Sequence, residues 1–335
     1  MKTVNVGMVG LGYWGPNIFR NFIAQPSCRM LRASDLSENN IQKMRALYPA
    51  VDYSTEASSI FSDPAIELVL IATPTSTHYP LVTEALKAGK HVFVEKPMCA
   101  SIAEAEVLIA LAEEKGKRLF VDHTFAYAPA VTEMRRRFEA GELGGLLYFD
   151  STRINLGIIQ LDTNVLWDLA VHDLTILSQM KNLSDVTDVC CHGTAHYGKQ
   201  IEVAHLHLTF KDGFMAHIHV SWLSPAKMRK TIVAGTDAMM IYDDIEPSEK
   251  LRVYDRGVVR GQEVPNPMLP TYRVGNVIIP ALSTKETLSI AAADVLECVR
   301  NNNTPRVSGK DGLSILKILT AADRSMQEND TVHVA

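Results

Sequence analysis

The sequence is poor in the features that mark secreted, membrane and nucleic-acid-binding proteins. Its cysteines are odd in number and scattered without a C-x-x-C pair, which is typical of reduced thiols; they are Cys28, Cys99, Cys190, Cys191 and Cys298. No apolar run approaches the ~20 residues that a membrane-spanning helix needs. With 33 basic and 38 acidic residues the net charge is −5, which argues against a nucleic-acid-binding surface.

The length of 335 residues is enough for two domains that each bury a hydrophobic core. The N-terminus leads directly into an apolar segment, which leaves no room for a signal peptide. We therefore expect a cytoplasmic protein.

A glycine-rich turn near the N-terminus is the most informative segment. The apolar run Val4–Val9 predicts a buried strand, and residues 10–15, GLGYWG, follow with the G-x-G-x-x-G spacing of a dinucleotide-binding turn. Pro16 then begins a helix, whose free N–H groups would face a pyrophosphate. A glycine-rich turn without a ligand is the alternative. The cofactor contacts expected here are Gly10, Gly12, Tyr13, Trp14 and Gly15.

An acidic residue follows the second predicted strand, residues 30–34. Asp35 lies twenty-five residues after Gly10, where a carboxylate binds the ribose hydroxyls of NAD and repels the extra phosphate of NADP. The alternative role is an N-cap, because a helical pattern begins at Ser37. The position favours the ribose.

Strands and helices continue to alternate through the first third of the chain. Strands are predicted near Val51 and at residues 67–72, 91–94 and 119–121, with helices between them. This alternation predicts a doubly wound parallel sheet covered on both faces, an α/β Rossmann domain spanning residues 1–122. Residues 73–78, TPTSTH, follow a strand where ligand is expected. The predicted cofactor contacts there are Thr73, Pro74, Thr75 and His78.

The tripeptide Glu95-Lys96-Pro97 ends another strand of this sheet. A residue before proline is held in an extended conformation, so Lys96 should present its side chain at the strand end, beside the expected nicotinamide. A surface lysine is the alternative. We expect Glu95 to lie at the same cofactor site.

A second domain is predicted over residues 123–335. Asn164 can cap a helix over residues 165–180, which carries one apolar stripe and one polar line. The polar line would ordinarily be the solvated face of the helix. It consists of Asp168, His172, Thr175 and Gln179.

These motifs together resemble the Gfo/Idh/MocA oxidoreductases, and the resemblance covers nearly the whole chain. Members combine an N-terminal G-x-G-x-x-G, a loop like residues 72–78, an E-K-P tripeptide with a catalytic lysine, and a D-x-x-x-H helix opposite it. The resemblance implies an NAD-dependent dehydrogenase with Lys96, Asp168 and His172 as catalytic and substrate-binding residues. Histidine titrates near neutral pH, so His172 is the expected general base. Lys96 would hydrogen-bond the reacting oxygen, and Asp168 would position sugar hydroxyls.

The expected substrate is a sugar. Residues 13–17, YWGPN, the segment 123–127, HTFAY, and the IIP of residues 278–280 resemble members that oxidise C3 of a UDP-N-acetylhexosamine or its uronic acid in surface-polysaccharide biosynthesis. Tyr127 and Arg153 are further expected substrate contacts, although a salt bridge is an equal alternative for Arg153, as it is for Arg273. The family often has arginine near Ala126, which this chain lacks. A polyol or inositol dehydrogenase, a keto-sugar reductase and a non-catalytic dinucleotide sensor are the alternatives.

From Val186 the pattern changes to the alternation of an α+β domain with a large, open, mainly antiparallel sheet. A three-residue loop at residues 211–213 would pair Phe210 with Phe214 and place four histidines on one face: His205, His207, His217 and His219. No carboxylate or thiolate completes an evident zinc site, so we predict no metal. The resemblance implies that this face forms a homo-oligomer, a dimer or tetramer, with no nucleic acid or membrane partner.

The C-terminal third contains a proline-rich segment and two predicted helices. Residues 257–283 include Pro265, Pro267, Pro270 and Pro280 and are typical of an active-site or subunit-spanning arm. Ser283 and Glu286 have capping-box spacing and predict a helix to about residue 300. A last helix is predicted over residues 312–326.

Overall fold

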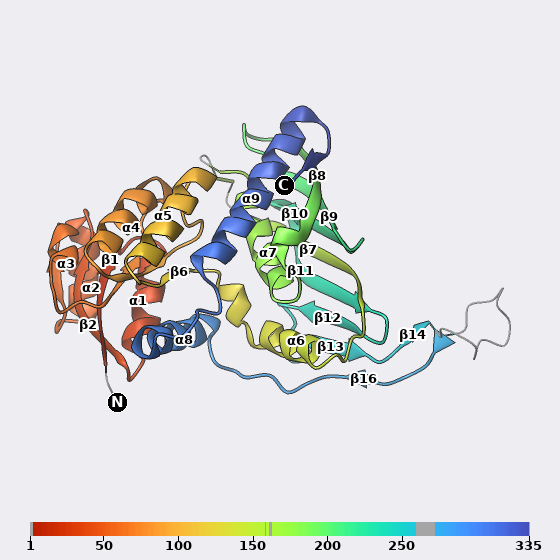
Figure 1. The fold of residues 1–335 in the computed structure, drawn as a ribbon, viewed down its shortest axis with the longest axis horizontal. Helices are drawn as coiled ribbons and strands as arrows, with labels where there is room; N and C mark the ends of the chain where they lie inside the picture. Colours follow the sequence, from red (N-terminus) through yellow and green to blue (C-terminus); the bar gives the residue numbers. More distant parts are fainter. Residues whose placement is uncertain (1–2, 158, 161–162, 259–271, 335) are drawn as a thin grey trace. The chain divides into compact units, whose positions relative to one another are not determined.

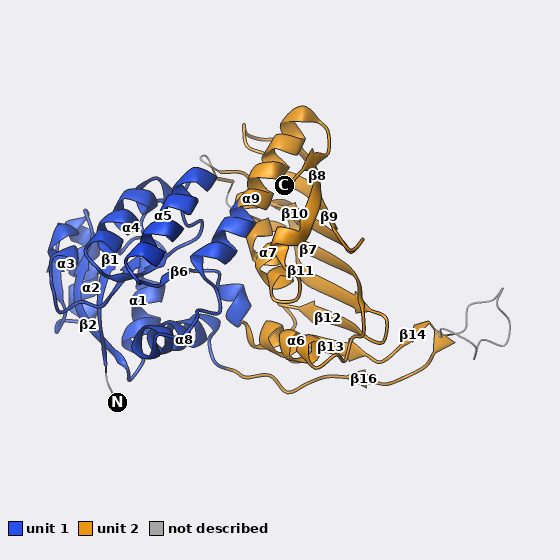
Figure 2. Ribbon diagram, in the orientation of Figure 1, with its two compact units in different colours: residues 1–127, 285–316 blue, residues 128–284, 317–335 orange. Residues whose placement is uncertain are grey.

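A computed structural model describes residues 3–157, 159–160, 163–258 and 272–334. The chain divides into two compact units, one formed by residues 1–127 and 285–316 and the other by residues 128–284 and 317–335 (Figure 2). The predicted boundary after residue 122 lies close to the first division. The return of residues 285–316 to the first unit is a difference from the predicted domains.

Unit 1 contains a six-stranded parallel sheet in the order β3-β2-β1-β4-β5-β6, so the predicted Rossmann sheet is confirmed (Figure 1). Its centre is apolar on both faces, with Leu68, Val69, Leu70 and Ile71 all fully buried, as a doubly covered parallel sheet requires. The strands are β1 Val4–Val9, β2 Cys28–Ser34, β3 Asp52–Ser54, β4 Leu68–Ile71, β5 His91–Val94 and β6 Leu119–Val121.

The helices of unit 1 alternate with these strands, except for one that arrives from the C-terminal part of the chain. They are α1 Gly15–Ile23, α2 Glu38–Leu47, α3 Ser58–Phe61, α4 His78–Lys87, α5 Ile102–Glu114 and α8 Thr287–Asn301. Helix α8 contacts α1 and β1, and buries Leu288, Val295 and Leu296 in the same core as Phe19 and Phe22. The polar side of this contact is an ion pair between Arg20 Nη2 and Glu286 Oε1 at 2.8 Å.

The predicted capping box at residues 283–286 is wrong. The N-cap of α8 is Glu286 rather than Ser283, and the Glu286 side chain makes no capping hydrogen bond. The carboxylate of Glu286 instead accepts hydrogen bonds from Arg20 and from Asn21 Nδ2, the latter at 3.0 Å. An interaction between helices far apart in sequence therefore replaces the local cap.

Unit 2 contains a nine-stranded sheet in the order β16-β13-β12-β11-β7-β10-β9-β8-β17. Among the described strands of this nine-stranded sheet, only the β10–β7 pair is parallel. The predicted mainly antiparallel sheet is therefore confirmed. The strands are β7 Leu146–Leu156, β8 Val186–Thr194, β9 Val203–Phe210, β10 Met215–Ser221, β11 Leu223–Gly235, β12 Met239–Asp243, β13 Leu251–Tyr254, β16 Val277–Ile278 and β17 Val332–His333. A separate pair joins β14 Gly257–Val258 to β15 Tyr272–Arg273.

Helices contact one face of the nine-stranded sheet. Helix α6, Pro129–Glu139, packs on β12, and α7, Val171–Ser178, packs on β7 (Figure 1). The last helix, α9 Gly309–Glu328, begins in unit 1 and ends in unit 2. No helix in the described ranges is both long enough and apolar enough to cross a bilayer.

The β9–β10 hairpin has the predicted register. Phe210 N donates to Phe214 O at 2.9 Å, and His207 and His205 lie opposite His217 and His219. The alternation of buried and accessible residues along both strands, with Leu206, Leu208, Ile218 and Val220 buried, fixes which face points inwards.

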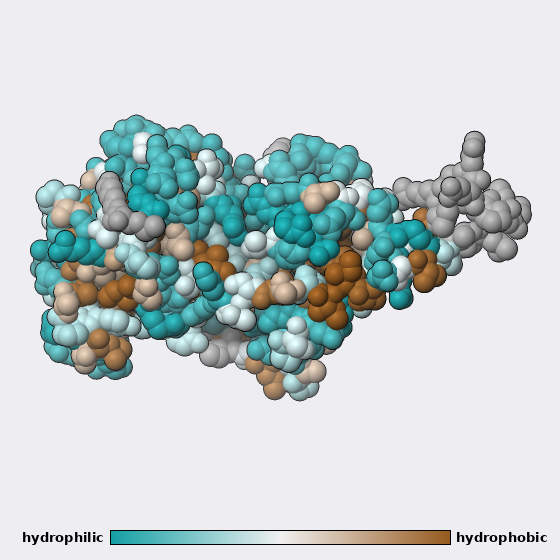
Figure 3. All heavy atoms as spheres, turned by 90° about the horizontal axis from the view of Figure 1, so that it is seen from below, coloured by the Kyte–Doolittle hydropathy of each residue, from teal (hydrophilic) through white to brown (hydrophobic). Residues whose placement is uncertain are grey.

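Exposed apolar side chains occur in the described part of the predicted arm. Pro265, Pro267 and Pro270 lie outside the described residues, but the following segment exposes large apolar side chains; these are Tyr272, Val274, Val277, Ile278 and Ile279. Figure 3 shows brown, apolar surface on unit 2.

Candidate functional site

The glycines after β1 have three different surroundings. Gly10 has φ +97°, and a Cβ atom there would lie 2.4 Å from the carbonyl oxygen of Ala72. A Cβ on Gly15 would lie 2.4 Å from the carbonyl oxygen of Gly10. By contrast, a Cβ on Gly12 would meet no atom within 4 Å. Gly10 and Gly15 are therefore required by the fold, whereas Gly12 leaves open space at the turn, as close approach of a ligand requires.

The start of α1 is open in the same way. Its N-cap is Trp14, no described side chain caps it, and Pro16 occupies the first turn, where a missing N–H costs nothing. The uncapped amides and the positive end of the helix dipole favour an anion here. Tyr13 beside it is 94% exposed, so its ring is available to a ligand.

Asp35 connects the glycine turn to the second strand. Its Oδ2 accepts a hydrogen bond from the backbone N–H of Leu11 at 2.6 Å, and its Oδ1 accepts from Ser37 N at 2.8 Å and Asn40 Nδ2 at 3.2 Å. The N-cap of α2 is Ser37, whose side chain accepts from Asn40 N. Ser37, and not Asp35, is therefore the N-cap of α2. The carboxylate of Asp35 lies instead at the glycine turn.

A cavity of about 420 Å³ lies at this turn, between the ends of β1, β2 and β4. Its lining includes predicted cofactor contacts from three segments of the chain: Gly10, Gly12, Asp35, Thr73 and Pro74. Glycine backbone, an acidic side chain and small polar residues around an elongated ligand are what the adenosine and pyrophosphate of NAD need. These residues fit the cofactor that the sequence predicts.

The loop at residues 73–78 has two kinds of residue. Thr73 and Pro74 line the cavity, whereas Thr75 begins a single 3₁₀ turn, Thr75–Thr77. His78 is 1% exposed, and its ring nitrogens lie 2.8 Å from the carbonyl oxygens of Thr73 and Pro97. Burial lowers the pKa of His78. The structure therefore does not support direct cofactor binding by His78, which instead joins this loop to the loop after β5.

Glu95 and Lys96 lie directly after β5, at the carboxyl end of the sheet, as predicted. The Lys96–Pro97 peptide bond is cis. Both side chains are partly buried, and the charge of Lys96 acts on two buried neighbours at the end of β6, Asp122 and His123.

Asp168 and His172 belong to unit 2. The predicted helix begins with a π-helical turn, Leu166–Ala170, and continues as α7. Asn164 caps it as predicted, since its Oδ1 accepts from Leu166 N at 3.0 Å. Trp222 Nε1 donates to Asp168 Oδ2 at 2.9 Å and fixes that carboxylate.

Only part of the predicted polar line is accessible. Thr175 is 1% exposed and donates its hydroxyl to Val171 O at 2.7 Å, so it belongs to the helix itself. Asp168, His172 and Gln179 are partly exposed. Asp168 and His172 therefore remain the accessible titratable pair on this helix.

Two predicted substrate contacts have buried side chains that hydrogen-bond other residues of the protein. Tyr127 is 3% exposed and donates its hydroxyl to Asp294 Oδ2 at 2.9 Å. Arg153 is 2% exposed, and its Nε and Nη2 donate to Asp173 at 2.9 and 3.1 Å. Each of these two side chains is buried and hydrogen-bonds a carboxylate of its own unit, so the structure does not support either one as a substrate contact. Arg273 is exposed and pairs with Asp255.

The four histidines lie together on one face of the β9–β10 hairpin. The rings of His205 and His219 stack at 4.2 Å and those of His207 and His217 at 4.7 Å, while His217 Nδ1 lies 3.2 Å from Asp150 Oδ2. Burial and the neighbouring histidines lower the pKa values of His205, His207 and His219. No group of three or more histidine, cysteine, aspartate or glutamate side chains in the described chain is arranged to hold a metal ion.

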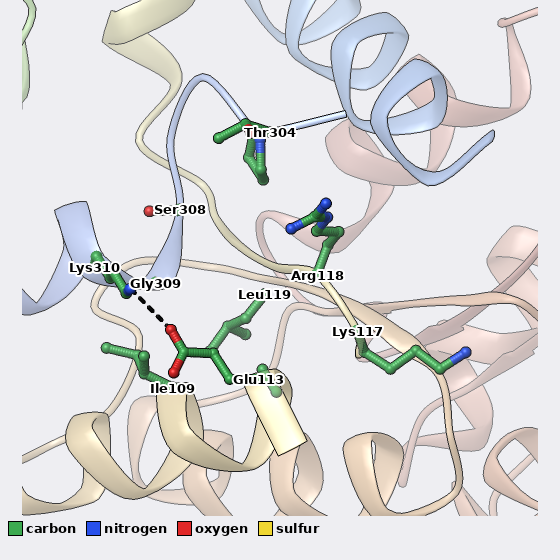
Figure 4. Close-up of a pocket in the computed structure, with 11 residues that line it drawn as sticks. Ile109, Glu113, Lys117, Arg118, Leu119, Thr304, Ser308, Gly309 and Lys310 are labelled. Carbon is green, nitrogen blue, oxygen red and sulfur yellow. Dashed lines mark ion pairs between the residues drawn. The ribbon is translucent and has the colours of Figure 1, made fainter. Parts of the chain in front are cut away.

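A second cavity of unit 1, about 180 Å³, has a different lining. It lies between the end of α5, β6 and the start of α9, and Figure 4 shows Lys310 paired with Glu113 across it, with Nζ and Oε1 2.8 Å apart. None of the predicted cofactor or substrate contacts is among its lining residues. We therefore place the candidate site at the glycine turn.

Two family models match the chain. The model of the oxidoreductase family with an NAD-binding Rossmann fold matches residues 4–123, and the model of the GFO/IDH/MocA C-terminal domain matches residues 131–241. The two together cover more than half of the sequence. The chain belongs to the Gfo/Idh/MocA family. It is therefore an oxidoreductase whose N-terminal domain binds NAD, as the sequence predicted.

Full-length relatives in this family have different substrates. The chain is 25% identical to scyllo-inositol 2-dehydrogenase (NAD(+)) of Bacillus subtilis, over 99% of this chain and 96% of the relative. It is 26% identical to UDP-N-acetylglucosamine 3-dehydrogenase of Acidithiobacillus ferrooxidans, over 77% and 79%. A solved structure of the latter enzyme has a TM-score of 0.84 at 22% identity, covering 98% and 99% of the two chains. That likeness shows the shared fold.

Two residues that hold predicted site residues in place, Trp222 and Asp122, were not predicted from the sequence. Trp222 fixes Asp168, and Asp122 accepts a hydrogen bond from Trp14 Nε1 at 3.3 Å. Asp122 directly follows the predicted last strand of the sheet, where polar residues at a carboxyl end face ligand, and that signal was available in the sequence. Trp222 gave no such signal, because its partner lies 54 residues away.

Proposed function

We propose that this oxidoreductase transfers a hydride between a secondary hydroxyl of a sugar or polyol and NAD. The observation that carries the proposal is the cavity at the glycine turn, whose lining joins open Gly12 to the carboxylate of Asp35. The family supplies the reaction class, and the full-length relatives are dehydrogenases of inositols and of a nucleotide sugar.

The chain's own residues supply the proton chemistry and the orientation of substrate. NAD held at the glycine turn by Gly12 and Asp35 would supply the hydride acceptor. Lys96 donates a hydrogen bond to the reacting oxygen, which favours the negative charge that develops there. His172 takes the proton of the hydroxyl group, and Asp168, held by Trp222, hydrogen-bonds neighbouring hydroxyls.

We further propose that the substrate is a UDP-N-acetylhexosamine or its uronic acid, oxidised at C3 in surface-polysaccharide biosynthesis. The likeness to UDP-N-acetylglucosamine 3-dehydrogenase supports this choice. The second candidate is a free inositol or polyol, because inositol dehydrogenases are equally similar over the full chain. Arg153 is buried and bonded to Asp173, so it supports neither candidate.

The cofactor preference follows from Asp35. Its carboxylate lies at the turn and lines the cavity, so it hydrogen-bonds ribose hydroxyls and repels a 2′-phosphate. We propose that NAD is preferred over NADP.

The protein is proposed to be a cytoplasmic homo-oligomer. Five cysteines without disulfides suit a reducing compartment. The face of the nine-stranded sheet that carries the histidines also exposes Tyr148 and Met215, at 41% and 61%, and a second copy of the chain is the proposed occupant of that face.

The direct test is NADH absorbance with a panel of UDP-N-acetylhexosamines, their uronic acids, inositols and free polyols. We expect turnover with NAD on one class, and at least about tenfold lower kcat/KM with NADP. Binding of NAD without turnover of any panel member would contradict the proposal and favour a dinucleotide sensor.

Two variants test the proposed roles on the substrate that reacts. His172→Ala and Lys96→Met should each lower kcat by about 10²-fold or more while leaving NAD affinity within about threefold. Gln179→Ala, on the same polar line as His172, is the matched control and should keep near-wild-type kcat. A His172→Ala enzyme with wild-type kcat would remove the general-base assignment.

A further inference from the structure

A buried carboxyl group lies at the end of β6, next to the residues that the proposed reaction uses. The backbone N–H of Asp122 donates to Val94 O at 2.8 Å, which sets Asp122 beside the end of β5, two residues before Lys96. Asp122 is 3% exposed. Its Oδ2 accepts the indole N–H of Trp14 at 3.3 Å, whereas its buried Oδ1 has no hydrogen-bond partner among the described residues.

Burial and two neighbouring residues, Trp14 and Lys96, affect the ionisation of this carboxyl group. Burial raises the pKa of Asp122 to about 7, and the Trp14 hydrogen bond and the charge of Lys96 act in the opposite direction. The next residue, His123, is 2% exposed, and burial together with Lys96 lowers its pKa to about 3. His123 is therefore neutral at neutral pH. Lys96 is the charged group that acts on Asp122 within the described chain.

A buried carboxyl group with an unused oxygen is costly for stability, and an apolar residue would fill the same place without that cost. Asp122 contacts the N-cap of α1, where the pyrophosphate is expected, and acts electrostatically on the lysine expected at the reacting oxygen. Its two interactions thus join the two ends of the candidate site within unit 1.

We propose that Asp122 is a positioning residue that couples Lys96 to the glycine turn. Its carboxylate interacts electrostatically with the charge of Lys96 and holds the Trp14 indole at the start of α1. The proposal rests on the proposed role of Lys96 in the reaction. When Asp122 gains a proton, the negative charge that acts on Lys96 is lost and the Trp14 hydrogen bond weakens, so both ends of the site respond to one ionisation.

The test begins with intrinsic tryptophan fluorescence of the full chain without cofactor or substrate, titrated from pH 5 to 9. The wild type should show a transition near pH 7, since the Trp14 indole N–H bonds the ionising group. Asp122→Asn keeps an acceptor for that N–H but cannot ionise, and Trp14→Phe removes the reporter; both variants should lack the transition. A transition that survives in either variant overturns the proposal.

Lys96→Met then separates electrostatic coupling from a merely structural contact. Removing the ammonium group removes a charge that favours the carboxylate, so the midpoint of the Trp14 transition should move to higher pH. Lys117→Met, in the same unit but away from Asp122, is the matched control and should leave the midpoint unchanged. An unmoved midpoint in Lys96→Met overturns the coupling.

The kinetic consequence uses the substrate identified by the panel. Asp122→Asn should lower kcat by about tenfold or more, with KM for NAD within about threefold, and should flatten the decline of kcat below pH 7. Wild-type kcat with an unchanged pH profile overturns the proposal. If no substrate reacts but the fluorescence results hold, the proposed function fails while the link between Asp122, Trp14 and Lys96 stands.

Discussion

At the scale of single residues, substitutions in the glycine turn should separate effects on the stability of the fold from effects on NAD affinity. Gly15→Ala places a Cβ 2.4 Å from backbone and should cost about 1–3 kcal/mol of stability. Gly12→Ala places a Cβ in open space, so its stability should stay within about 0.5 kcal/mol, while NAD affinity falls about tenfold or more. Thermal unfolding and NAD titration calorimetry measure the two effects. Wild-type NAD affinity in Gly12→Ala would contradict a pyrophosphate at this turn.

Residue roles were predictable where a motif is local and unpredictable where the partner is distant. The glycines, Asp35 and Lys96 belong to short motifs, and the structure places them after the ends of β1, β2 and β5, where those motifs predict them. Tyr127 hydrogen-bonds Asp294, which lies 167 residues away in the sequence, and no periodic pattern predicts such a partner. A buried polar residue in a long-range pair looks, in the sequence, the same as a substrate contact.

At the scale of elements, α8 tests whether the C-terminal segment completes the NAD-binding unit. Leu296 is fully buried against the core that includes Phe19 and Phe22, so Leu296→Ala should cost about 2–5 kcal/mol of stability. Glu297→Ala on the exposed side of the same helix is the matched control, expected within about 0.5 kcal/mol. Thermal unfolding and NAD affinity are measured for both variants. Equal effects of the two variants would contradict the packing of α8 in unit 1.

The register of the β9–β10 hairpin followed from the sequence because its signals are local. Alternation and turn chemistry predicted the β9–β10 register, since a one-residue slip would expose every apolar side chain of the hairpin. The surface against which α8 packs could not be predicted from the sequence in the same way. Its apolar face required burial, but amphipathic periodicity does not state which surface covers it.

At the scale of the whole molecule, the open sheet face predicts self-association. Met215→Asp places a charge on that face and should shift the wild-type oligomer to monomer in sedimentation velocity. Leu47→Asp, at an exposed site of α2 in the other unit, is the control and should keep the wild-type mass. A monomeric wild type, or an unchanged mass in Met215→Asp, would contradict the assignment of this face.

The residues proposed for hydride transfer come from both units, Lys96 from unit 1 and the Asp168–His172 pair from unit 2. The most direct test uses the reactive panel member deuterated at its carbinol carbons, with mass spectrometry of the reduced cofactor. We expect NADH that carries one deuterium, together with the corresponding keto product. Unlabelled NADH, or oxidation of the sugar without reduction of NAD, would contradict it.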